Sequence, residues 1–168
     1  MPPGRLIGSA AGALTQDARS DLMGRVKVAA LLTWLLTASV GGYLLWTWLV
    51  NGGWRTRRQA EGSRFAPALI LGHGGLAATG LLLWLGFLAT GANPFAWLSV
   101  GVLLPVAVLG FTMFGLWLRA GHGKPRGRHA YLPRHAAEDH FPPPAVLGHG
   151  VFAVATVVLV LFTAIRTG

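Results

Sequence analysis

The sequence contains no cysteine, which excludes disulfides, thiolate metal sites and cysteine-bound iron–sulfur clusters. Acidic residues are also scarce, with five Asp and Glu against fourteen Lys and Arg. Three stretches, 28–54, 65–118 and 141–165, contain no Asp, Glu, Lys or Arg at all. A proton-coupled pump needs titratable carboxylates within its spans, so this class is disfavoured. A phosphate-binding glycine loop and a Ser–His–acid set are also missing.

Apolar residues dominate the chain instead. They make up 53% of its 168 residues, the mean hydropathy is +0.54, and only 11% of residues are charged. A spanning helix needs about 20 apolar residues. The middle stretch is long enough for two spans, which Thr90–Pro94 would separate. The sequence therefore predicts an all-α integral membrane four-helix bundle, residues 25–168, with spans at about 26–50, 67–90, 95–118 and 144–165.

Residues 1–24 lack a clear hydrophobic period, and we expect an N-terminal tail with at most a short helix near residues 14–23. The apolar run between Arg5 and Leu14 is too short and too rich in glycine to favour a signal peptide.

The net charge of +9 is concentrated in two loops, residues 51–66 and 119–143. Lys and Arg gather in short cytoplasmic loops of membrane proteins, so we expect a multi-pass cell-membrane protein with these loops in the cytoplasm and both termini outside. The basic loops would also attract anionic lipid headgroups. The expected partners are the bilayer and other membrane subunits, and not nucleic acid.

A short motif occurs twice, as Leu71-Gly-His-Gly74 and Leu147-Gly-His-Gly150. When these segments are aligned, the preceding helices also align, with Gly41–Gly52 over Gly110–Gly121. This pattern indicates two tandem two-helix hairpins. Each histidine follows an entry proline by five or six residues, which places both at roughly 8–9 Å depth on parallel helices. Helices two and four of an up-down bundle are diagonal, so His73 and His149 could face each other.

A histidine inside a bilayer is a functional candidate by default. Small residues surround each of these two on its helix, which would leave room for a large flat ligand. Two imidazoles from facing helices can bind haem iron axially, so we predict a haem b site. Its expected residues are His73 and His149 as iron ligands, the small residues Gly72, Gly74, Ala77, Gly80, Gly148, Gly150 and Ala153, and Arg58, Arg64 and Arg134 for the propionates. A quinone or a lipid headgroup is an alternative ligand, and helix packing without a ligand is another interpretation.

In its four spans and paired Leu-Gly-His-Gly motifs, the chain resembles the four-helix b-type cytochromes and the haem-binding anchor subunits of respiratory enzymes. The resemblance implies an electron-transfer subunit of a larger redox complex, and the single histidine pair implies at most one haem. An accessory or assembly subunit without a cofactor and a small transporter are the alternatives.

Residues 135–140, His-Ala-Ala-Glu-Asp-His, resemble one histidine box of the membrane di-iron desaturases and hydroxylases. Those sites need several boxes, so His135, Glu138 and His140 form only a weak alternative metal site. Tryptophans near the span ends are expected to be interfacial anchors, namely Trp46, Trp48, Trp54, Trp97 and Trp117.

Overall fold

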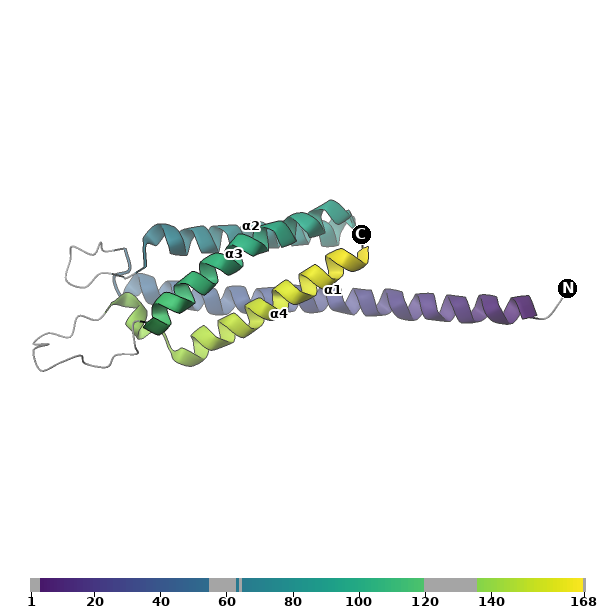
Figure 1. Ribbon diagram of the computed structural model, residues 1–168, viewed down its shortest axis with the longest axis horizontal. Coiled ribbons are helices and arrows are strands. Elements are labelled where there is room, and N and C mark those ends of the chain that lie inside the picture. Colours follow the sequence, from purple (N-terminus) through teal and green to yellow (C-terminus); the bar gives the residue numbers. More distant parts are fainter. Residues whose placement is uncertain (1–3, 55–62, 64, 120–135, 168) are drawn as a thin grey trace, which may run out of the picture.

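The computed structural model describes residues 4–54, 63, 65–119 and 136–167, and within them the chain is helical without strands. Four long helices, α1 (Gly4–Val50), α2 (Pro67–Thr90), α3 (Asn93–Arg119) and α4 (Pro143–Thr167), lie alongside one another (Figure 1). A short 3₁₀-helix, η1 (Ala137–His140), precedes α4. Each long helix is long and apolar enough to cross a membrane. The fold class is therefore all-α, with four candidate spans and the architecture of a multi-pass membrane protein.

Proline and glycine set the ends of α2. Pro67 occupies the first turn, where its missing N–H leaves no hydrogen bond unmade. Gly91 ends the helix in the left-handed conformation with φ of 68°, and its N–H donates to the Phe87 carbonyl at 2.8 Å. α3 then begins at Asn93, so these two helices form a tight hairpin.

The N-terminal segment differs from the expected tail, because α1 is one continuous helix from Gly4 to Val50. At 1.5 Å per residue, this helix of 47 residues is about 70 Å long. Its N-terminal part extends beyond the other three helices (Figure 1). No proline occurs between Gly4 and Trp54, and adding a turn to an existing helix requires no new nucleation.

The packing of the helices does not follow the two predicted hairpin units. The most extensive contacts join α2 to α3 and α1 to α4, those between α3 and α4 are intermediate, and α1 and α2 contact each other least. This arrangement places α2 and α4 diagonally across the bundle. Each helix therefore has its main partner in the other predicted repeat unit.

The apolar core fills the half of the bundle away from the basic loops. Its buried residues are Ala30, Trp34, Trp84, Phe87, Ala96, Leu103, Val160 and Ala164. Gly80 faces Trp34, whose ring would lie 3.1 Å from a Cβ added there. At the end of this half, the Lys27 Nζ lies 4.9 Å from the Phe87 ring centroid, and the Thr167 hydroxyl donates to Asn93 Oδ1 at 3.1 Å. These contacts place residue 27 of α1 level with the ends of the other three helices.

A buried polar network, formed by Trp48, Ser63 and Glu138, closes the opposite end. The Trp48 indole N–H donates to the Ser63 hydroxyl at 2.8 Å, and that hydroxyl donates to Glu138 Oε2 at 3.0 Å. We call these three residues the loop-end network. It joins the C-terminal turn of α1 to η1 through a residue of the first loop.

The tryptophans expected as interfacial anchors divide into two groups. Trp46, Trp54 and Trp97 are exposed, as an anchor requires. The prediction is wrong for Trp48 and Trp117, which are 0% and 8% exposed. Trp48 is buried because the loop-end network provides its indole N–H with a partner inside the protein.

Candidate functional site

The two histidines of the repeated motif come together between α2 and α4. The ring centroids of His73 and His149 are 6.2 Å apart, with 61° between the ring planes. Both side chains are half-buried. Each histidine lies in the second turn of its helix, so the pair lies in the half of the bundle nearer the basic loops.

Each imidazole is fixed by a hydrogen bond to the backbone of a neighbouring helix. The Nδ1 of His149 lies 3.0 Å from the Thr37 carbonyl oxygen of α1, and the Nδ1 of His73 lies 3.0 Å from the Val106 carbonyl oxygen of α3. A carbonyl oxygen can only accept, so in both rings the Nδ1–H is the donor. The proton is thereby placed on Nδ1, and Nε2 keeps the lone pair that a metal needs.

A glycine makes each of these approaches possible. A Cβ added at Gly41 would lie 2.9 Å from Cε1 of His149, and one added at Gly110 would lie 3.2 Å from Cε1 of His73. Each glycine follows the accepting residue by four positions, which places it one turn along the same helix face. These two glycines were not among the residues predicted for the site, although Gly41 aligns with Gly110 in the repeat.

The two halves of the site are equivalent in their contacts. In each half, a histidine donates to a carbonyl of the neighbouring helix and packs against the glycine four residues further on. Thr37 and Gly41 of α1 correspond to Val106 and Gly110 of α3 in the repeat alignment. The geometry is therefore nearly two-fold symmetric about the histidine pair.

The small residues expected around the histidines lie in different environments. A Cβ added at Gly72, Gly74, Gly148 or Gly150 would have no atom of the described residues outside its own helix backbone within 4 Å. Ala77 and Ala153 are half-buried. Gly80 instead belongs to the apolar core, where Trp34 packs against it. The space beside the imidazoles thus comes from the flanking glycines and from Gly41 and Gly110.

The charged residues predicted for the site are described only in part. Arg58, Arg64, Arg134 and His135 lie outside the described residues. Glu138 is buried in the loop-end network, whereas His140 is exposed. Among the residues that the structure describes, no three or more His, Cys, Asp or Glu are grouped so that they could hold a metal ion.

The arrangement offers two preoriented nitrogen donors, one from each diagonal helix. Hydrogen bonding of the distal nitrogen to a backbone carbonyl is the usual support of metal-ligating histidines, since it fixes the tautomer and the ring orientation. Neither a family model, a curated protein nor a solved structure matches this chain, so its own geometry carries the interpretation.

Proposed function

We propose that this protein is a membrane-embedded b-type haem subunit for electron transfer, with His73 and His149 as the axial ligands. The separation of the two imidazoles carries this proposal. A metal–imidazole bond of about 2.0–2.1 Å, added to roughly 1.1 Å from the nitrogen to its ring centre, gives roughly 6.3 Å between two rings on opposite sides of one metal. The ring centroids of His73 and His149 are 6.2 Å apart.

The number of donors favours haem over a free metal ion. Zinc in proteins takes four ligands, and the described residues provide a pair of imidazoles without a third His, Cys, Asp or Glu beside it. A porphyrin supplies four equatorial nitrogens itself and asks the protein only for axial ligands. Bound haem would supply a one-electron redox couple. The protein's part is to hold both rings, keep the proton on Nδ1 and exclude competing ligands.

The orientation in the membrane follows from the basic loops. We propose that loops 51–66 and 119–143 are cytoplasmic and that both termini lie outside, because nine of the fourteen basic residues belong to these two loops. The histidine pair then lies near the cytoplasmic surface, where Arg58, Arg64 and Arg134 would bind the propionates. A single haem at this depth suits a subunit that exchanges electrons with a partner on the same side, such as a larger respiratory complex in the cell membrane.

We also propose that the two units arose by duplication of one two-helix hairpin. The equivalent carbonyl and glycine contacts of the two histidines support this origin, because unrelated helices would have no reason to repeat the same spacing. After such a duplication, each helix would pack against a helix of the other unit and not against its own hairpin partner, as α1 does with α4 and α2 with α3.

Optical spectroscopy tests the haem proposal directly. Protein purified from haem-replete cells is expected to contain about one haem b per chain and to show the α band of a six-coordinate haem on reduction. Titration of haem-free protein with haemin should saturate at about one equivalent per chain. A colourless preparation that also fails to bind added haemin would refute the proposal.

A cofactor-free accessory subunit is the second candidate, because the two Nδ1–carbonyl bonds could simply link neighbouring helices. Substitution by asparagine separates the two functions. The Asn amide nitrogen can occupy the position of Nδ1 and donate to the same carbonyl, but no atom replaces Nε2. We expect His149→Asn to lower the affinity for haem at least tenfold, while the melting temperature of the haem-free protein changes little.

The matched control for this substitution is His140→Asn, in an exposed histidine outside the pair. It should bind haem as the wild type does. If His149→Asn binds haem normally, His149 is no ligand, and the accessory role is the better description.

A further inference from the structure

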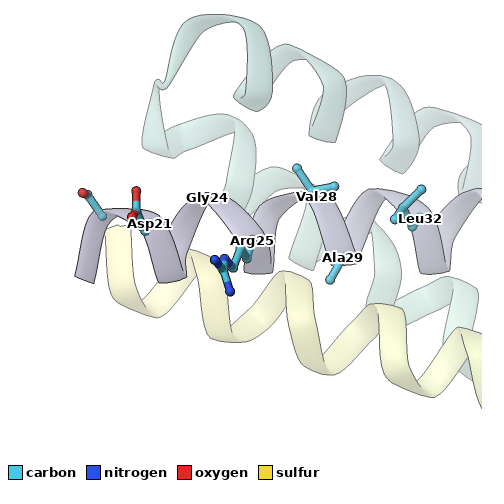
Figure 2. Close-up of a pocket in the computed structure, with 7 residues that line it drawn as sticks. Asp21, Gly24, Arg25, Val28, Ala29 and Leu32 are labelled. Carbon is cyan, nitrogen blue, oxygen red and sulfur yellow. The ribbon is translucent and has the colours of Figure 1, made fainter. Parts of the chain in front are cut away.

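An open groove of about 610 Å³ lies along the outer part of α1, remote from the histidine pair. Its wall includes Asp21, Gly24, Arg25, Val28, Ala29 and Leu32, all from one face of the helix (Figure 2). The residues towards the N-terminus are polar or charged, and those towards the bundle are apolar. The groove is therefore amphipathic along its length.

The groove crosses the level at which the bundle ends. Lys27 is level with Phe87 near the end of α2, so Val28 and Leu32 lie inside the bundle's apolar span and Arg25 lies just outside it. Asp21 is about 9 Å beyond Lys27 along the helix. The headgroup layer on each side of a bilayer is about 5–8 Å thick. Arg25 thus lies within the headgroup layer and Asp21 just beyond its outer edge, with the apolar half of the groove beside the acyl chains.

The two charges are close but are not paired with each other. Figure 2 shows Asp21 and Arg25 pointing to different sides of Gly24. Gly24 has no atom outside its own helix backbone within 4 Å of an added Cβ, so the surface between the charges is open. Both charged side chains are exposed, as are Val28 and Leu32, each at 55%.

We propose that this groove binds a phospholipid with a primary-amine headgroup, of the phosphatidylethanolamine type. Its phosphate pairs with Arg25, its ammonium donates hydrogen bonds to Asp21, and an acyl chain lies along Val28, Ala29 and Leu32. A purely anionic lipid satisfies Arg25 but places negative charge beside Asp21. A choline headgroup is cationic but has no N–H to donate. Charge complementarity therefore disfavours an anionic lipid, and the N–H donors favour the primary amine over choline.

Native mass spectrometry of the full chain, released from mixed micelles of phosphatidylethanolamine, phosphatidylcholine and phosphatidylglycerol, tests this site. We expect the wild type to retain the ethanolamine lipid roughly three- to fivefold over each of the others, the range of one exposed charge pair. Asp21→Asn should abolish the preference over phosphatidylglycerol, and Arg25→Gln should weaken retention of all three lipids. Gly24→Leu should fill the groove and displace them.

Arg19→Gln is the control, since Arg19 is exposed on α1 but does not line the groove. It should retain lipid as the wild type does. Equal retention of the three lipids by the wild type, or unchanged selectivity in Asp21→Asn, would overturn the proposal. A dimer mass that Gly24→Leu abolishes without changing lipid retention would assign the groove to a second copy of the chain instead. None of these outcomes depends on haem, so the experiment tests the lipid site independently of the proposed function.

Discussion

Gly41→Val should lower haem binding at least tenfold, the scale on which support of a metal ligand acts. Already a single Cβ at this position would lie 2.9 Å from Cε1 of His149. Valine adds two further methyl groups, and its stiff side chain on a helix cannot rotate away. The imidazole would have to move from α1 and lose its bond to the Thr37 carbonyl. The tautomer and orientation that leave Nε2 with a free lone pair would be lost with it.

The neighbouring residue provides a matched control. Gly42 is exposed and has no atom outside its own helix backbone within 4 Å of an added Cβ, so Gly42→Val introduces the same side chain without a contact. Haemin titration of the two variants, beside their thermal unfolding, separates loss of the site from loss of the fold. Wild-type affinity in Gly41→Val would show that the imidazole does not need its position against α1. Gly110→Val should act in the same direction through His73.

Gly53→Ala is expected to cause the largest loss of stability among substitutions of one methyl group. A Cβ at Gly53 would overlap the indole ring of Trp48, which is 0% exposed and held by Ser63. The Gly53 N–H also donates to the Trp48 carbonyl at 2.9 Å, so the backbone cannot easily move away. Overpacking of this kind destabilises by about 1–3 kcal/mol.

Thermal unfolding in detergent measures this effect, at roughly 2–4 °C per kcal/mol for a chain of this size. Gly101→Ala is the control, because Gly101 is an exposed helix residue with open space around its Cβ position. It should be neutral or slightly stabilising, since alanine is the better helix former. An unchanged melting temperature for Gly53→Ala would mean that the loop-end network does not contribute to the stability of the bundle.

Much of the bundle could be predicted where proline and glycine mark its boundaries. α2 begins at Pro67 and ends at Thr90 as expected, because an entry proline and a left-handed glycine are both visible in the sequence. The start of α1 could not be predicted in this way. Pro2 and Pro3 precede this start in the sequence, but the following turns are rich in glycine and their apolar period is weak, so only propagation from the span extends the helix to Gly4.

The histidines of the site could be predicted from the sequence, but their backbone partners could not. The similar offsets from Pro67 and Pro144, six and five residues, indicated the depth of both histidines, because depth along a helix depends on local sequence alone. Their partners, the carbonyls of Thr37 and Val106, carry no signal in residue type, since every residue has a carbonyl. Burial of Trp48 was equally invisible, because its partner Ser63 lies in another segment. Such contacts depend on which helices become neighbours, and the sequence does not state this directly.

The pairing of α1 with α4 has a consequence for biosynthesis. Among these four helices α1 leaves the ribosome first, but its main partner is α4, so α1 lacks that partner while the α2–α3 hairpin forms. His73 can bond to Val106 within that hairpin, but His149 meets Thr37 only once α4 has inserted. The four helices therefore acquire their pair of nitrogen donors only when α4 packs against α1.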